Sequence, residues 1–364
     1  MTVTLTEGDR DAFFETPFEA YGPDVGYVSP LKSDVMRMLD PAKNPLWTAG
    51  NPFRFWVARR DGRLVGRIIA HRHGASNERH GWTRMQFGFF DCANDPEAAT
   101  ALLGAAEEFA REDGQNELVG NFNLTAMQQG GVMTGGFGPG AYTDMVVGPR
   151  HLPDLLEANG FTRFFPMRTF EIDLASANLP DQAPTQADGY AFAPIEKSNF
   201  PQRMEESRAV LNDGFAENPM FVPLTEAEFT FQAGEMMSIL DPRLSSVLLH
   251  DGRPVGTIIC IPDLNGFLAA TRSRIGLLTP FHYLRYRLNR RRAVIIFYSV
   301  VGEHQGRGLM GAMLARTVGA LRSAGYRTLG VTWIADSNAA SLRQVEKLGG
   351  RPLHHLHLYR KDVR

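Results

Sequence analysis

The sequence has few cysteines and no long uninterrupted apolar run, and both shortages limit what the protein can be. Cys92 and Cys260 are the two cysteines among 364 residues, and they lie far apart. Their number and spacing indicate neither a disulfide framework nor a cysteine metal site. No apolar run is long enough to cross a membrane, and residues 1–10 are polar and charged without the apolar core of a signal sequence. These features predict a cytoplasmic protein.

The sequence also lacks clear metal-ligand patterns, and its net charge is small. The ten histidines show no ligand spacing that includes a carboxylate partner, so we expect no metal site. His354, His355 and His357 alternate along a predicted strand, and we interpret them as strand residues. The formal net charge of −2 says little about partners. The length suggests two domains, each large enough for its own core.

The most informative stretch is a predicted strand, a glycine-rich turn and a helix. Residues 293–301 form an unbroken β-branched and aromatic run, which predicts a buried strand. Apolar residues then recur at helical spacing from 309 to 321. Glycine lets the backbone approach a ligand, and free N–H groups at a helix start attract anions. We therefore predict an anion site on the turn, formed by Gln305, Gly306, Arg307, Gly308, Leu309, Met310 and Gly311.

The residues after this helix repeat the alternation of strand and helix. We expect a strand over Thr328–Ile334, a helix over Leu342–Leu348 and a last strand over Leu353–Tyr359. Asp336, Ser337 and Asn338 suit the start of that second helix, and two glycines follow its end. The order and the spacing of these two motifs resemble the acyl-CoA-binding half of the Gcn5-related N-acetyltransferase (GNAT) superfamily.

The resemblance implies a donor and the residues that hold it. In this superfamily the glycine turn and helix start bind the pyrophosphate of coenzyme A. The strand edge before the turn, here near Val300 and Val301, hydrogen-bonds the acyl carbonyl and the pantetheine arm. Asn338 and Ser341 would orient the pantetheine or the leaving group. Two positions depart from the family pattern: Met310 stands where a small residue is usual, and Val345 replaces a tyrosine that usually protonates the leaving thiolate.

The first half shows the same order of elements without the glycine turn. Asp95 and Glu97 stand at the start of its first long helix, where they would repel phosphates. Residues 57–69 and 247–259 share an Asp-Gly-Arg turn followed by Val-Gly, an internal repeat that indicates a duplicated domain. We therefore expect an α/β fold with a mixed sheet, in two tandem GNAT-like domains. Their predicted ranges are 1–174 for a degenerate N-terminal domain, 175–189 for a linker and 190–364 for the donor-binding domain.

The likeness extends over nearly the whole chain. Short phrases in both halves resemble a group of bacterial tandem acetyltransferase-like proteins that lies close to bacterial ceramide synthases. This resemblance identifies the donor chemistry better than the acceptor. The phrases are Tyr27–Leu31, Leu39–Pro41, Lys43–Pro45, Gly88–Phe90 and Pro262–Asn265.

Arginine is concentrated in one segment. Residues 271–330 contain eleven arginines, no lysine and one acidic residue, a local balance of +10. A solvated surface is the simplest interpretation. A polyanion such as a tRNA acceptor arm is a second, and an anionic membrane surface is a third, since apolar residues interleave with the arginines. The candidate polyanion-binding residues are Arg285, Arg287, Arg290, Arg291 and Arg292.

We predict from these features an N-acyltransferase that moves an acyl group from acyl-CoA to an amine. An amine must lose a proton to attack, so a base is needed; Glu303, His304 and Asp263 are the candidates. Tyr298 replaces the missing tyrosine as the candidate proton donor. The acceptor is expected to be a small-molecule or lipid amine, with no DNA partner. An aminoacyl-tRNA donor and a non-catalytic binding protein of the same fold are the alternatives.

Overall fold

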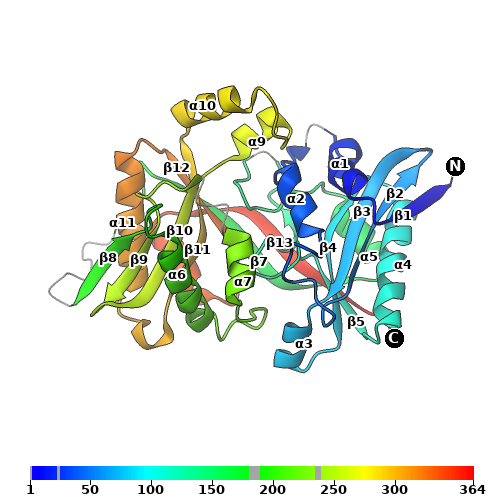
Figure 1. Ribbon diagram of the computed structural model, residues 1–364, viewed down its shortest axis with the longest axis horizontal. Helices are drawn as coiled ribbons and strands as arrows, with labels where there is room; N and C mark the ends of the chain where they lie inside the picture. The colour runs from blue at the N-terminus through cyan, green and yellow to red at the C-terminus, as the bar shows by residue number, and fades with distance from the viewer. Residues whose placement is uncertain (1, 23–24, 139, 180–188, 234–238) are drawn as a thin grey trace. The chain divides into compact units, whose positions relative to one another are not determined.

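The computed structural model describes residues 2–22, 25–138, 140–179, 189–233 and 239–364. The chain divides into two compact units, neither of which is continuous in sequence (Figure 1). Unit 1 comprises residues 1–168, 267–282 and 354–364, and unit 2 comprises residues 169–266 and 283–353. Most of the predicted linker, residues 180–188, lies outside the described residues. Over the described residues, no helix is both long and apolar enough to cross a membrane.

Unit 1 is built on a sheet in the order β1-β2-β3-β4-β5-β13, with β6 also paired to β13. β4 and β5 are parallel, whereas β1, β2 and β3 are joined to their neighbours as antiparallel pairs. The elements that begin in this unit are β1 (Val3–Glu7), α1 (Arg10–Ala20), α2 (Lys32–Met38), β2 (Phe53–Arg60), β3 (Arg63–Arg72), α3 (Gly74–His80), β4 (Arg84–Cys92), α4 (Pro96–Glu112), β5 (Glu117–Gly120), β6 (Val132–Gly135), α5 (Leu152–Ala158) and β7 (Thr162–Asp173).

Unit 2 repeats this plan with strands in the order β8-β9-β10-β11-β12. Here β11 and β12 form the parallel pair. The mixed sheets and the alternation of strand and helix confirm the predicted fold class. The elements from residue 190 onward are β8 (Tyr190–Pro194), α6 (Phe200–Gly214), α7 (Glu226–Ala233), β9 (Ser246–His250), β10 (Arg253–Pro262), α9 (Asn265–Thr271), α10 (Thr279–Asn289), β11 (Arg292–Val300), the 3₁₀ helix η3 (Gly302–His304), α11 (Leu309–Ser323), β12 (Thr328–Ala335), α12 (Ala339–Lys347) and β13 (Arg351–Asp362).

The two Val-Gly pairs of the internal repeat have the same structural role. A Cβ on Gly66 in β3 would lie 2.6 Å from Leu102 of α4, and a Cβ on Gly256 in β10 would lie 2.8 Å from Met313 of α11. Each glycine therefore lets one long helix pack closely on its sheet. The next residue points to the opposite face, since Thr257 hydrogen-bonds Ser207 of α6 at 2.9 Å. Unit 2 is thus covered by helices on two faces, α11 on one and α6 on the other.

The last strand, β13, joins the sheet of unit 1. Residues 359–362 pair antiparallel with residues 117–120 of β5. This arrangement differs from the expectation that the strand over 353–359 would complete the C-terminal half. β5 is only four residues long, and β13 covers the edge that it would otherwise expose. His354, His355 and His357 lie in β13 as predicted, with His354 buried and His355 exposed.

A buried histidine of unit 1 should make stability fall in acid. Burial lowers the pKa of His71 to about 3, so the folded protein keeps this ring neutral while the unfolded chain protonates it below about pH 6.5. The unfolded state then binds more protons, and the free energy of unfolding decreases as pH falls through 6.5. One such group accounts for a loss of about 1.4 kcal/mol by pH 5.5. Urea unfolding between pH 7.5 and 5.5 should show a shallower pH slope for His71→Gln than for the wild type.

The exposed His355 of the same unit provides the control for this measurement. His355→Gln should leave the contribution of His71 to the pH slope in place, because it replaces an exposed ring and keeps the buried one. An equal slope for His71→Gln and wild type would show that His71 does not govern the acid response.

Candidate donor-binding site

The parallel pair β11 and β12 separates before either strand ends. Within the described residues, their register runs from Arg292–Thr328 to Ile295–Val331, although β11 continues to Val300. The side-chain hydroxyl of Thr332 donates to the Ile296 carbonyl at 3.0 Å where the ladder stops. The last five residues of β11 therefore have one edge without β12 main-chain pairing. A strand edge of this kind can hydrogen-bond an extended ligand.

The N–H groups at the end of β11 point in alternate directions. The Val301 N–H donates to the Val255 carbonyl of β10 at 3.0 Å, so it cannot polarise an acyl carbonyl. This contradicts the expectation for Val301. Since successive strand residues face opposite neighbours, the Val300 N–H points to the side that β12 has left. Val300 therefore remains the candidate donor to the acyl oxygen.

The turn after β11 has the geometry of an anion site. Gly306 and Gly308 adopt φ of +78° and +77°, and a Cβ on either would meet no atom within 4 Å. The helical ladder of α11 begins when the Ala312 N–H donates to the Gly308 carbonyl at 3.1 Å. The N–H groups of residues 309–311 precede this ladder, as the first donors of any helix do. Arg307 is exposed between the two glycines, and its Nη2 donates to the Glu303 carbonyl at 3.4 Å.

Met310 and Gln305 support the turn without filling it. Met310 is half-buried and packs against the apolar core of unit 2. The methionine side chain therefore points into the core, and the backbone N–H of Met310 stays at the start of α11. The Gln305 Nε2 donates to the Val300 carbonyl at 3.1 Å and so ties the turn to the strand end.

Tyr298 comes together with the start of α12. Its hydroxyl donates to the Ser341 carbonyl at 3.5 Å, and the Asn338 side chain accepts from the Ser341 N–H at 3.1 Å. Asn338 is thus the N-cap of α12, as its residue type predicts. Burial raises the pKa of Tyr298 to about 12, so the phenol keeps its proton at neutral pH. Val345, by contrast, is fully buried in the core.

Two of the other acid–base candidates, Glu303 and His304, lie in η3. Glu303 is exposed in η3, directly before the turn. The adjacent His304 is buried, with its Nδ1 3.0 Å from the Tyr190 hydroxyl and its ring 4.9 Å from that of His250. Asp213 at the end of α6 was not identified from the sequence. Its carboxylate accepts from the Gly302 N–H at 2.6 Å, a contact across 89 residues that no local pattern indicates.

Asp263 does not lie with the other catalytic candidates. It follows β10 and pairs with Arg292 at the start of β11, at 2.8 Å. The glycine turn follows the opposite end of β11, about 25 Å away along a strand of this length. Asp263 is buried and held by this ion pair, so its position indicates a structural role.

The five arginines proposed for a polyanion divide into two sets. Arg290 pairs with the buried carboxylate of Asp241 at 3.0 Å, and Arg292 pairs with Asp263. Their charges are balanced inside unit 2. The side chains of Arg285, Arg287 and Arg291 are exposed and remain candidates for contact with a partner.

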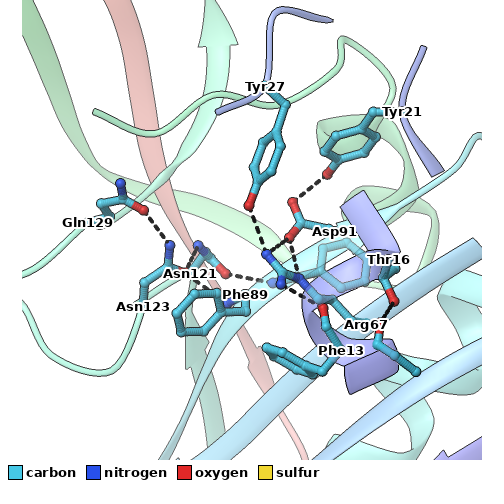
Figure 2. Close-up of polar contacts among 12 residues, drawn as sticks. Phe13, Thr16, Tyr21, Tyr27, Arg67, Phe89, Asp91, Asn121, Asn123 and Gln129 are labelled. Atoms are coloured by element: carbon cyan, nitrogen blue, oxygen red, sulfur yellow. Dashed lines mark hydrogen bonds and ion pairs between the residues drawn. The ribbon is translucent and has the colours of Figure 1, made fainter. Parts of the chain in front are cut away.

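The corresponding strand edge in unit 1 is already occupied. The N–H groups of Phe89 and Phe90 in β4 donate to the side-chain oxygens of Asn123 and Asn121, at 2.8 and 3.0 Å. Figure 2 shows these amides in a row that continues to Gln129. A Cβ on Gly88 would lie 1.6 Å from the Phe122 carbonyl oxygen, so the backbone also closes this edge.

The helix start in unit 1 is likewise unsuited to phosphate. Asp95 caps α4, and Arg60 pairs with both Asp95 and Glu97, at 2.6 and 2.9 Å. These acids lie where the sequence predicts them. Together with the filled strand edge, they support the expectation that unit 1 is the degenerate copy.

Unit 1 instead contains a buried ionic cluster that the sequence reading missed. Arg67 is fully buried and bonds Asp91 through its Nε at 2.7 Å, the Phe13 carbonyl at 2.7 Å and the Tyr27 hydroxyl at 3.0 Å (Figure 2). Tyr21 donates to the other oxygen of Asp91 at 2.6 Å. A small hollow adjoins the cluster. Because these groups satisfy one another, we assign them to the stability of unit 1.

Comparisons with known proteins agree with this geometry. Residues 214–349 match the model of the acetyltransferase (GNAT) family, and this range contains the turn and α12. Protein YghO of Escherichia coli is 27% identical over 99% of this chain and 94% of its own. A bacterial ceramide synthase of Caulobacter vibrioides is 24% identical over 98% of this chain and 96% of its own.

Solved structures show the same fold. A tandem GNAT protein from the clavulanic acid biosynthesis pathway superposes with a TM-score of 0.61 at 14% identity, covering 100% of this chain and 99% of its own. A GCN5-related N-acetyltransferase from Sphaerobacter thermophilus superposes with a TM-score of 0.58 at 14% identity, covering 100% of this chain and 96% of its own.

Proposed function

The chain is a tandem GNAT-fold protein with its acetyltransferase-family segment in the C-terminal half, and from this premise we propose that it is an N-acyltransferase using an acyl-CoA donor. The observation that carries the proposal is the open turn at Gly306 and Gly308. The exposed Arg307 lies in this turn, and the first N–H groups of α11, which have no partner within the helix, follow it. Glycine at both positions leaves room for a pyrophosphate, and the positive end of α11 favours its charge.

The proposed reaction forms a C–N bond and breaks a C–S bond. The donor supplies an acyl group as a thioester, which an amine attacks. The Val300 N–H would polarise the carbonyl, because it faces the edge without β12 pairing. Glu303 is the proposed base for the amine proton, since its carboxylate is exposed directly before the turn, whereas that of Asp213 accepts from the Gly302 N–H. Tyr298 would give its proton to the departing sulfur, and Asn338 would keep Ser341 and the start of α12 in place.

A lipid amine is the acceptor class that we propose. One full-length relative is named a ceramide synthase, and a ceramide is the amide of a long-chain amino alcohol. That name agrees with amide formation on an amine that carries a long apolar chain. Incubating the protein with acyl-CoA and a long-chain amino alcohol, and detecting the amide by mass spectrometry, tests this part directly.

The turn can be tested with two substitutions of equal size. Asp and Asn both tolerate the left-handed backbone of Gly308, and they differ in charge. Gly308→Asp should weaken acyl-CoA binding about tenfold or more, because a unit charge in contact with phosphate costs more than about 1 kcal/mol. Isothermal titration calorimetry at low salt measures the effect.

Gly308→Asn is the matched control for the charge. It should stay within about threefold of the wild type in donor affinity, since it adds a similar volume without the negative charge. Equal affinities for the two variants would contradict an anion site at this turn.

An aminoacyl-tRNA donor is the second candidate, favoured by the exposed Arg285, Arg287 and Arg291. If this donor is used, ribonuclease should abolish acyl transfer. The affinity of the protein for the tRNA should also fall steeply with salt, because each phosphate contact releases counterions. Activity with acyl-CoA that ribonuclease leaves intact would exclude this donor.

A further inference from the structure

The helix α10 exposes apolar side chains that a helix of a globular protein would bury. Eight large hydrophobic residues are exposed in the described chain, and six of them lie between residues 275 and 288. Each of the six is more than half exposed, and Leu277 is completely so. They are Ile275, Leu277, Leu278, Phe281, Leu284 and Leu288.

The arrangement of these residues is amphipathic, with the apolar side outward. Within α10, Phe281, Leu284 and Leu288 follow one another at intervals of three and four residues, which places them on one face of the helix. Leu277 and Leu278 lie in the turn directly before it. The half-buried side of α10 instead carries polar and aromatic residues: His282, Tyr283, Tyr286 and, just beyond the helix, Arg290. The apolar face of α10 therefore faces away from the protein.

Positive charge borders this apolar face. At 100° per residue, Arg285 and Arg287 project on either side of the stripe that contains Phe281 and Leu284. Both are exposed, and neither forms an ion pair within the described residues. No acidic residue occurs in the sequence between Asp263 and Glu303.

We propose that α10 is an interfacial helix that seats the protein on an anionic lipid bilayer. An exposed apolar stripe enters the boundary between headgroups and acyl chains, and flanking arginines bind lipid phosphates. The helix has 11 residues, about 16 Å, so it is too short to span and would lie in the plane of the surface. A nucleic acid would match the arginines, but it would leave the leucines and phenylalanine exposed to water.

The proposal does not depend on acyl transfer, so it is tested without donor or acceptor. The probe is a vesicle of equimolar phosphatidylglycerol and phosphatidylcholine, with pure phosphatidylcholine for comparison. The wild type should cosediment with the anionic vesicles at low salt and bind at least tenfold more weakly to the neutral ones. Absence of binding to the anionic vesicles would overturn the proposal.

Two variants separate the apolar and the electrostatic contributions. Leu277→Ser, Phe281→Ser and Leu284→Ser together should weaken vesicle binding at least tenfold, because they remove the side chains that enter the bilayer. Arg285→Gln with Arg287→Gln should weaken it about tenfold at low salt and make the remaining binding less sensitive to salt. All five side chains are exposed, so both variants should keep the wild-type melting temperature.

Matched controls come from other exposed positions. Leu5→Ser with Leu179→Ser removes exposed leucines elsewhere, and Arg63→Gln with Arg253→Gln removes two exposed charges from hairpin strands. Both should bind vesicles as the wild type does. Equal loss in controls and test variants would contradict a specific role for α10. Conversion of a wild-type dimer to a monomer by the triple serine variant, with vesicle binding unchanged, would instead assign the stripe to self-association.

Discussion

Replacing Tyr298 with phenylalanine should lower kcat at least 100-fold while donor affinity stays within about twofold. A positioned proton donor contributes about 10² to 10⁴ in rate, and phenylalanine keeps the ring that packs in the core while it removes the hydroxyl near Ser341. Single-turnover kinetics with the amide product, together with donor titration, separate the loss of rate from a loss of binding.

The pH dependence and a second tyrosine complete this test. Because burial raises the pKa of Tyr298 to about 12, the phenol stays protonated through pH 10 and the rate should not fall with its ionisation below that pH. Tyr326→Phe is the control, since Tyr326 is buried in the same core and its hydroxyl has no hydrogen-bond partner among the described residues. A kcat for Tyr298→Phe equal to that of Tyr326→Phe would leave Tyr298 with a packing role alone.

Asp91→Asn should lower the free energy of unfolding of the protein by about 3–5 kcal/mol, because it leaves the charge of the buried Arg67 without its carboxylate. It also leaves the Tyr21 hydroxyl with a weaker acceptor. Urea unfolding followed by circular dichroism measures the loss. Because the cluster lies in unit 1, donor affinity of the folded variant should be unchanged.

Two further variants distinguish the ion pair from a general effect of losing an acid. Glu112→Gln removes one partner of the exposed pair with Arg54 and should cost less than about 1 kcal/mol. Replacing Arg67 by methionine and Asp91 by leucine together should recover much of the stability lost in Asp91→Asn, because no unpaired charge then remains buried. A loss for Asp91→Asn no larger than that for Glu112→Gln would contradict the assignment.

The sequence predicted those parts of the fold that depend on local patterns. The start of α12 at Asn338 follows from its capping residue type, and the hairpin turns follow from Asp-Gly pairs, which adopt positive φ at residues 61–62 and 251–252. The glycine turn after β11 is equally local. In each case a few adjacent residues determine the backbone conformation.

The features that the sequence did not predict depend on pairings between distant residues. The direction of the Val301 N–H depends on the register of β11 against β10, which a one-residue shift would reverse. The contact of Asp213 with Gly302 spans 89 residues. The ion pair of Arg67 and Asp91 likewise needs β3 and β4 to be side by side, and Arg67 read locally is an ordinary strand residue.

The pairing of β13 with β5 also has a consequence for how the chain folds. The pairs Tyr359–Gly120 and Asp362–Glu117 join residues that are 239 and 245 positions apart in the sequence. Closing so long a loop costs entropy before the contact forms, so pairings of this kind are slow. We therefore expect the β5 edge to be among the last parts of unit 1 to be covered during folding.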